Sequence, residues 1–354
     1  MFILCFHQSV LVFFSFPNHD QFKLEKIQFN TTKISDKKPS IHLIVFDAYP
    51  GFHSLNKHFS YSNVEIKEFL LQNNFHVFDT FQSNYYQTQH SINSILNLQY
   101  LPYLENYNTS LFNKRFYVAE QIKKSKLVTF FKQNSYTFNN NSIFDIDNQK
   151  RKGEILSAQS TNYFHFRGVL HRKVIADIGW NFGIGKYKIN YFYQTIIMNQ
   201  HYANQTAISY LLNKKFQKKH FTYSHIMMPH EPYYTDKNGK LINPINALES
   251  YNPSFFIEYL KNTNRIMKKI VSHLRKMEPN AIIILMSDHG YRNLGEKQTN
   301  ALKCDNFMSV YFPDQNYYNL KKIQSNVNLF RLVLNQYFDQ KFPILPDKQV
   351  WINE

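Results

Sequence analysis

Short apolar runs along the chain alternate with longer segments in which apolar residues recur at helical spacing. Residues 41–46 (IHLIVF) and residues 281–286 (AIIILM) are almost wholly apolar. Such continuous runs are typical of strands that are buried on both faces of a parallel sheet. Residues 220–228 (HFTYSHIMM) alternate between polar and apolar side chains and then run apolar, which predicts a third strand.

Amphipathic patterns around these strands predict helices, at residues 63–74, 89–101, 185–215 and 255–277. A further strand and loop are expected at residues 75–85, and residues 121–142 predict a helix followed by an exposed Asn-rich loop. The alternation of strands with helices predicts an α/β fold, a three-layer α/β/α sandwich around a largely parallel central sheet.

The two ends of the chain differ in character. Residues 1–20 form a hydrophobic segment whose apolar stretch is shorter than the roughly 20 residues needed to cross a bilayer. It also lacks the basic start and small-residue cleavage site of a good signal peptide, so a poor signal, an interfacial anchor and the remnant of a membrane helix all stay open. Residues 21–39 are expected to be a linker, and residues 40–354 a single catalytic domain.

The charge balance suggests anionic partners. Lys and Arg total 41 against 25 for Asp and Glu, which gives a net charge of +16. No zinc-finger spacing, RNP-like aromatic motif or basic heptad helix is present, so nucleic acid is not expected as a partner. An anionic substrate or an anionic membrane surface remains, beside the alternative of a merely solvated basic surface. The two cysteines, Cys5 and Cys304, are far apart in sequence and predict neither a disulfide framework nor a Cys-based zinc site.

Acidic residues stand within two positions of the ends of the two most apolar strands. Asp47 follows the first strand, and Asp288 and His289 follow the strand at residues 281–286. Parallel strands place their carboxyl ends at one edge of the sheet, where α/β proteins bind their ligands. Carboxylate oxygens and imidazole nitrogens suit Zn²⁺ or Mn²⁺. The pattern therefore predicts a site for a divalent metal at this edge.

A candidate nucleophile lies between these acids. Thr88 stands directly before the helix expected at residues 89–101, where the partial positive charge of the helix start favours an alkoxide. A divalent cation beside it would activate the hydroxyl for attack. Thr88 could equally be a simple N-cap, and Ser91 and Ser94 in the same segment are alternatives as nucleophiles.

Taken together, these motifs resemble the alkaline phosphatase superfamily, and specifically the sulfatase-like branch that includes lipoteichoic acid synthases and phosphoethanolamine transferases. The resemblance rests on LIVFDAYP, NYYQTQHSINSILNLQYL, MMPHEPYY and ILMSDHGYR, with a weaker closing part, like the last strand and helix of that branch, in DNFMSVYFPDQNYYN and SNVNLFRLVLNQYF. It implies an alkaline-phosphatase-like fold over residues 40–345. It also implies one divalent ion, Mn²⁺ or Zn²⁺, held by four ligands, Asp47, Thr88, Asp288 and His289. In that family the hydroxyl attacks phosphorus or sulfur, and the group then passes to water or to an acceptor alcohol.

Further residues follow from the same resemblance. His230 matches the histidine that contacts the substrate or leaving group, and Arg292 could clamp a phosphate with two hydrogen bonds. Glu231 is expected at the surface or just behind the site. The chain departs from type I sulfatases, because neither cysteine lies in the Cys-x-Pro-x-Arg motif that becomes formylglycine. The extra ligands of a two-zinc alkaline phosphatase are not identifiable either, which favours a single metal.

The sequence thus predicts a metal-dependent hydrolase or transferase of phosphate or sulfate esters, acting on cell-envelope lipid head groups or glycans. Such a protein is expected outside the cytoplasm, in the periplasm or at the cell surface, with its N-terminal segment as a candidate membrane anchor. Its oligomeric state is left open. One alternative is a catalytically silent surface-binding protein on the same scaffold, and another is a relative of nucleotide phosphodiesterases or phosphoglycerate mutases.

Overall fold

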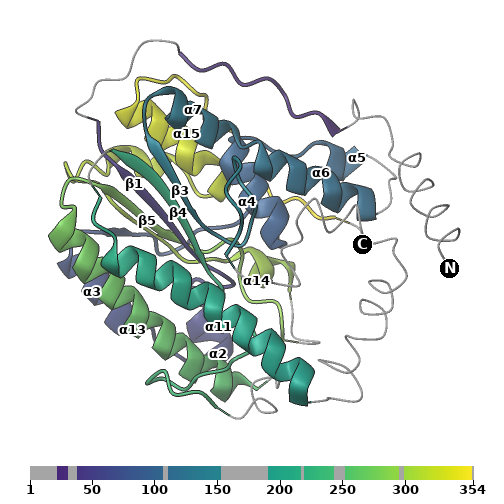
Figure 1. Cartoon of the computed structure of the whole chain (residues 1–354), viewed down its shortest axis with the longest axis vertical. Helices are drawn as coiled ribbons and strands as arrows, with labels where there is room; N and C mark the ends of the chain where they lie inside the picture. The colour runs from purple at the N-terminus through teal and green to yellow at the C-terminus, as the bar shows by residue number, and fades with distance from the viewer. Residues whose placement is uncertain are drawn as a thin grey trace, which may run out of the picture.

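A central sheet organises the computed structural model, which describes residues 22–30, 38–106, 111–152, 190–216, 219–242, 252–294 and 299–352. Its strands follow the order β2-β6-β5-β1-β4-β3. Figure 1 labels four of them, β1, β3, β4 and β5. They are β1 (Ile41–Phe46), β2 (His76–Val77), β3 (Thr137–Asn141), β4 (His220–Ile226), β5 (Ile282–Met286) and β6 (Met308–Tyr311). The pairs that involve β1, and the pair of β3 with β4, are parallel, whereas β6 runs antiparallel to β5 and β2.

The two central strands are apolar throughout because both of their faces are covered. Leu43 and Val45 of β1 belong to one buried cluster, whereas Ile44 and Phe46 belong to the other. Successive side chains of a strand point to opposite faces, so the alternation divides each strand between two cores. The apolar run of β5 is divided in the same way.

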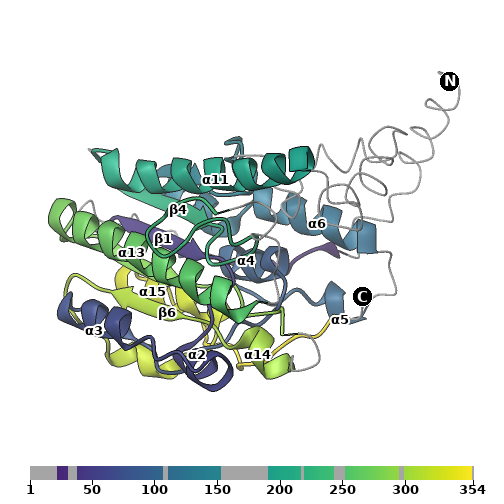
Figure 2. The ribbon, with the colours of Figure 1, turned by 90° about the horizontal axis from the view of Figure 1, so that it is seen from below.

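Helices cover both faces of the sheet and complete the three layers (Figures 1 and 2). One face packs against α2 (Phe52–Phe59), α3 (Val64–Gln72), α11 (Asn190–Asn213) and α13 (Pro253–Met277). The other packs against α4 (Thr88–Asn97), α6 (Leu111–Lys123), α7 (Lys126–Gln133) and α15 (Asn326–Tyr337). The short elements are α5 (Tyr103–Asn106), α14 (Asn300–Cys304) and the 3₁₀ helix η4 (Tyr318–Lys322). The α/β/α sandwich predicted from the sequence is therefore confirmed.

The Asn-rich segment was predicted wrongly. Instead of an exposed loop it forms the edge strand β3, which pairs in parallel with β4. Two of its three asparagines are tolerated there because their amides are hydrogen-bonded: Asn139 Nδ2 donates to Thr222 Oγ1 at 3.1 Å, and Asn140 Nδ2 donates to the Phe144 carbonyl at 2.8 Å. Satisfied amides remove most of the cost of burying polar side chains.

Residues 22–30, the first described part of the polar segment before β1, lie against the same fold. Phe22 stacks on Tyr117 with ring centroids 3.9 Å apart, and Phe29 stacks on Phe130 at 4.7 Å. The hydrophobic segment at residues 1–20 lies outside the described residues. Among the helices that are described, none has the length and apolar character needed to cross a membrane.

Candidate active site

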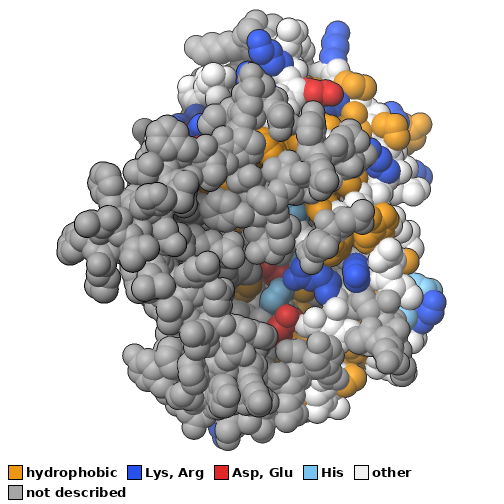
Figure 3. Space-filling model, turned by 90° about the vertical axis from the view of Figure 1, so that its right-hand side faces the viewer, with side chains coloured by type: hydrophobic (Ala, Val, Ile, Leu, Met, Phe, Trp, Pro, Cys, Tyr) orange, Lys and Arg blue, Asp and Glu red, His pale blue; other side chains and the backbone are white. Residues whose placement is uncertain are grey.

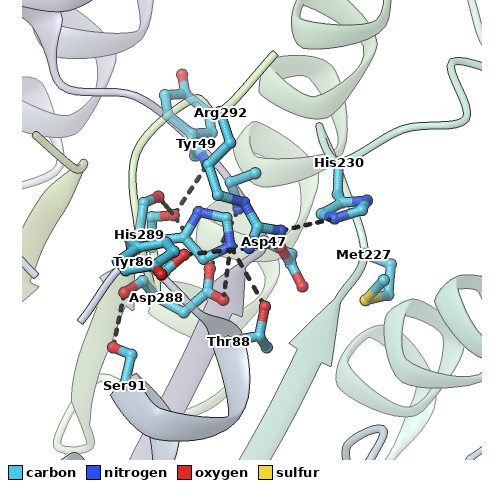
Figure 4. Close-up of polar contacts among 12 residues, drawn as sticks. Asp47, Tyr49, Tyr86, Thr88, Ser91, Met227, His230, Asp288, His289 and Arg292 are labelled. Carbon is cyan, nitrogen blue, oxygen red and sulfur yellow. Dashed lines mark hydrogen bonds and ion pairs between the residues drawn. The ribbon is translucent and has the colours of Figure 1, made fainter. Parts of the chain in front are cut away.

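The carboxyl ends of β1 and β5 bring the predicted acids together. The two strands are parallel and paired in register, so Asp47 and Asp288, which come just after them, lie side by side at the carboxyl end of the sheet. Asp47, Asp288 and His289 are all buried, and one donor atom from each lies within 4.8 Å of the others. Thr88, at the start of α4, faces this group (Figure 4).

The distances among these donor atoms suit one metal ion. His289 Nε2 lies 3.6 Å from Asp47 Oδ1, 3.4 Å from Asp288 Oδ2 and 3.3 Å from Thr88 Oγ1. Ligands about 2.0–2.1 Å from a tetrahedral zinc ion lie about 3.3–3.4 Å from one another. The two carboxylate oxygens are buried and accept no hydrogen bond from any described residue. Such orphaned buried acceptors are costly unless a cation satisfies them, so the residues present fit a divalent ion.

The backbone between the strands holds the second oxygen of Asp288 in place. Ala48 adopts a left-handed conformation with φ of 58°, and its N–H donates to Asp288 Oδ1 at 3.1 Å. A positive φ at a residue other than glycine stores a small strain, and such residues gather at functional sites. Next to it, the Tyr49 N–H donates to Ser287 Oγ at 2.8 Å. These bonds tie the two strand ends together and leave Asp288 Oδ2 for a ligand.

Gly290 allows the turn that presents His289. A Cβ atom at Gly290 would lie only 2.2 Å from the Leu302 carbonyl oxygen and 2.5 Å from that of Asp305, so no larger residue fits. His289 Nδ1 donates to the Gly290 carbonyl at 2.7 Å. That bond places the ring proton on Nδ1 and leaves the Nε2 lone pair for the metal.

Electrostatics keeps these side chains in the forms that bind metal. Burial would raise the pKa of Asp47, but His230, His225 and His289 together bring it well below its ordinary value. Burial and the nearby Arg292 lower the pKa of His289. The carboxylate is therefore ionised and the imidazole neutral at physiological pH.

Thr88 is not the N-cap of its helix. Gln87 holds that position, while Thr88 is the first helical residue and its hydroxyl lies beside His289. The hydroxyls of the two alternative nucleophiles donate hydrogen bonds to backbone carbonyls. Ser91 Oγ donates to the Asp288 carbonyl at 2.6 Å, and Ser94 Oγ donates to the Ser91 carbonyl at 3.0 Å. Figure 4 shows the Thr88 hydroxyl directed at the proposed metal position and the Ser91 hydroxyl directed away from it.

His225 belongs to the site but is not among the residues predicted from the sequence. It lies on β4, next to β1, and its Nε2 donates to Asp47 Oδ2 at 3.0 Å. Its Nδ1 accepts from the Tyr223 hydroxyl at 2.8 Å. His225 thus occupies one oxygen of Asp47 and turns the other toward the metal position. The sequence signal that could have identified it was a histidine in the strand predicted at residues 220–228, close to the end that parallel strands turn toward the site.

His230 and Arg292 meet at the rim of the site. Arg292 Nη2 donates to His230 Nε2 at 3.2 Å, and Arg292 Nη1 donates to the Tyr86 carbonyl at 3.1 Å. His230 Nδ1 donates to the carbonyl of Glu231 at 2.6 Å, and the partly exposed Glu231 carboxylate lies 3.7 Å from the same nitrogen. Arg292 therefore joins the loop before Thr88 to the loop after β4.

Positive charge gathers near this rim. Lys303 Nζ lies 5.2 Å from the centroid of the Tyr86 ring. The backbone carbonyl of the same tyrosine accepts the hydrogen bond from Arg292. Figure 3 shows Lys and Arg side chains beside histidine and acidic side chains in the middle of one face. Such a group of cations beside a metal position favours an anionic ligand.

Comparisons with known proteins give matches in structure alone. No sequence family and no curated protein matches the chain. A protein assigned as a sulfatase, YidJ from Bacteroides fragilis, superposes with a TM-score of 0.52 at 15% identity, over 89% of this chain and 75% of that one. The C-terminal periplasmic domain of the phosphoethanolamine transferase EptC from Campylobacter jejuni gives 0.50 at 14%, over 87% and 91%.

The corresponding periplasmic domain of EptC from Escherichia coli also gives a TM-score of 0.50, at 10% identity, over 89% of this chain and 86% of that one. At such low identities the similarity establishes the fold. The chain therefore has the alkaline-phosphatase-like fold of sulfatases and phosphoethanolamine transferases, as its sequence motifs predict.

Proposed function

We propose that this chain is a metal-dependent transferase or hydrolase of phosphate or sulfate esters, with Thr88 as its nucleophile. The observation that carries the proposal is the convergence of donor atoms from Asp47, Thr88, Asp288 and His289 on one position. The fold shared with sulfatases and phosphoethanolamine transferases supports the same class of chemistry.

Each residue has a role that its position suits. A bound Zn²⁺ or Mn²⁺ would polarise the ester and lower the pKa of the Thr88 hydroxyl. Thr88 Oγ1 would give up its proton and bond to phosphorus or sulfur while the bond to the leaving alcohol, which takes up a proton, breaks. An acceptor alcohol or water would then attack the same centre, and the bond to Thr88 Oγ1 would break. Arg292 provides N–H donors at the rim for the equatorial oxygens, and His230 lies beside it where the leaving or accepting oxygen would be.

The proposed substrate class is a phosphodiester of the phosphoethanolamine type, on a lipid head group or a glycan. A hydroxyl at the nucleophile position suits phosphoryl transfer, whereas the formylglycine route of type I sulfatases needs a cysteine that this site lacks. The two EptC neighbours named above are periplasmic domains, which supports a location outside the cytoplasm for this chain. Residues 1–20 would then serve as a signal or anchor ahead of the catalytic domain at residues 40–354.

A catalytically silent scaffold is the competing proposal. Relatives that lose activity are expected to lose ligands, yet all four positions here hold residues that can bind a metal. Retention of the complete set favours the enzyme.

Turnover tests the proposal directly. The purified chain, loaded with Zn²⁺ or Mn²⁺, is assayed with bis-p-nitrophenyl phosphate, p-nitrophenyl phosphate and p-nitrophenyl sulfate. We expect hydrolysis of the phosphodiester that EDTA abolishes, that Thr88→Ala lowers at least about 10³-fold and that Thr88→Ser largely retains. Ser94→Ala is the matched control, because it removes a hydroxyl from the same helix. Full turnover in Thr88→Ala would exclude Thr88 as the nucleophile.

A further inference from the structure

A second group of potential metal ligands lies far from the first. His42 is the second residue of β1, His220 is the first residue of β4, and Glu278 caps the C-terminus of α13. One donor atom from each lies within 4.8 Å of the others. Asp47 lies five positions after His42, which is a distance of about 16 Å along an extended strand. The group therefore occupies the opposite end of the sheet from the candidate active site.

The three donor atoms form a nearly equilateral triangle. His42 Nε2 and His220 Nε2 are 3.3 Å apart, and each lies 3.4 Å from Glu278 Oε2. These distances match the edges of about 3.3–3.4 Å that a tetrahedral zinc ion imposes on its nitrogen and oxygen ligands. The fit is as good as at the candidate active site.

Protons on both Nε2 atoms would satisfy this arrangement poorly. If both rings carried their proton on Nε2, two N–H groups would face each other across 3.3 Å while competing for one carboxylate oxygen. Both rings are buried, and Glu278 Oε1 and His42 Nδ1 are buried without a hydrogen-bond partner among the described residues. One cation between the three atoms would take the place of both protons and neutralise the carboxylate.

The surroundings hold the ligands in position and leave a way in. Phe216 stacks on His220 at 4.1 Å between centroids and meets His42 edge-on at 5.2 Å, which fixes both imidazole planes. Glu278, whose side chain is 15% exposed, also lines a surface hollow of about 640 Å³. Water from that hollow could complete the four-coordinate shell.

We infer that His42, His220 and Glu278 bind a second divalent ion, of the Zn²⁺ class, with a structural role. Two imidazoles and one carboxylate form a ligand set that zinc accepts, with a water as the fourth ligand. The ion ties the C-terminus of α13 to the amino ends of β1 and β4. These same strands carry Asp47 and His225 at their other ends, so the ion stabilises the strand pair on which the active site is built.

Metal counting in two variants separates this site from the active site. Protein stripped of metal, reloaded with Zn²⁺ and desalted is measured by inductively coupled plasma mass spectrometry. We expect two ions per chain in the unaltered protein, one in Asp288→Asn, one in His220→Gln and none in the double variant. His273→Gln is the matched control, because it removes a histidine from α13 outside the group and should keep both ions.

Spectroscopy identifies the ligands without relying on a variant of the new site. Co²⁺ added to Asp288→Asn should give the intense visible bands of tetrahedral cobalt. Zn²⁺ at a free concentration about one hundred times its Kd should raise the unfolding midpoint of the same variant by roughly 5 °C. Asp288→Asn that holds no metal, or His220→Gln that folds and still holds two ions, would overturn the inference. If the active-site proposal alone were wrong, the unaltered chain would hold one ion, lost in His220→Gln and kept in Asp288→Asn. Glu278→Gln replaces His220→Gln if near-UV circular dichroism shows that the latter does not fold.

Discussion

Replacement of His225 tests whether the metal position depends on a residue that would not touch the metal. In His225→Phe the ring shape is nearly kept, but Asp47 Oδ2 loses the donor that lies 3.0 Å away. Both side chains are almost completely buried, so water cannot easily replace the lost bond. Asp47 is then free to rotate, and its Oδ1 no longer points steadily toward the position shared with His289.

The size of the effect follows from the bond that is lost. A hydrogen bond to a buried charged group contributes about 1.5–3 kcal/mol, which corresponds to a weakening of about 10- to 150-fold. Outer partners of metal ligands affect metal affinity over the same range. We therefore expect His225→Phe to bind Zn²⁺ or Mn²⁺ about 10- to 150-fold more weakly than the unaltered protein. The loss should grow at acidic pH, because His225 helps to keep the pKa of Asp47 low.

Two companion variants show whether the donor itself is responsible. His225→Gln can still offer an N–H to Asp47 and should recover part of the affinity. Tyr223→Phe removes only the hydroxyl that donates to His225 Nδ1; burial keeps the pKa of Tyr223 far above neutrality, so it is a reliable donor in the unaltered protein. Its effect should be smaller than that of His225→Phe. The assay is competition with a chromophoric chelator, in the His220→Gln background so that one site is titrated. Affinity within about twofold of the unaltered value in His225→Phe would refute this reasoning.

Three further predictions concern the rim, the turn and the protons. Gly290→Ala forces a methyl group against the Leu302 carbonyl and should lower the free energy of unfolding by about 1–3 kcal/mol in urea titrations, and unchanged stability would contradict the contact. Arg292→Ala should raise KM for an anionic ester about tenfold or more, and Arg292→Lys should not restore it, because a single ammonium cannot make two parallel bonds; full rescue by lysine would contradict that role. Since the pKa values of Asp47 and His289 are both lowered, protons should compete with the metal only below the ordinary histidine value of 6.5. Affinity that already falls tenfold per pH unit above that value would contradict these pKa directions.

The sequence predicts the two strands that carry the site, and the acids that follow them, because both depend on strong local patterns. A strand buried on both faces is apolar along nearly its whole length, so β1 and β5 can be identified from the sequence. A charged residue just after such a strand is then easy to recognise. Asp47, Asp288 and His289 follow from that rule. Thr88 needed the motif around it, because a threonine before a helix is also what a simple cap would look like.

Other features depend on contacts that no local pattern records. His225 lies within a strand whose polar positions look like ordinary alternation, and only the pairing of β4 with β1 places it on Asp47. The asparagines of β3 favour a loop by composition, and the structure overrides this preference with hydrogen bonds from neighbouring segments. His42 and Glu278 are 236 positions apart, and α13, whose C-cap is Glu278, brings them together.

Anomalous diffraction from crystals grown with Zn²⁺ tests the central claim most directly. The account predicts a peak at the zinc edge about 2.0–2.2 Å from Asp47 Oδ1, Asp288 Oδ2 and His289 Nε2, with Thr88 Oγ1 completing the shell. The claim would be contradicted if zinc fully occupied another site, such as the one at His42, His220 and Glu278, while water or a side chain of this protein filled the position among Asp47, Asp288 and His289.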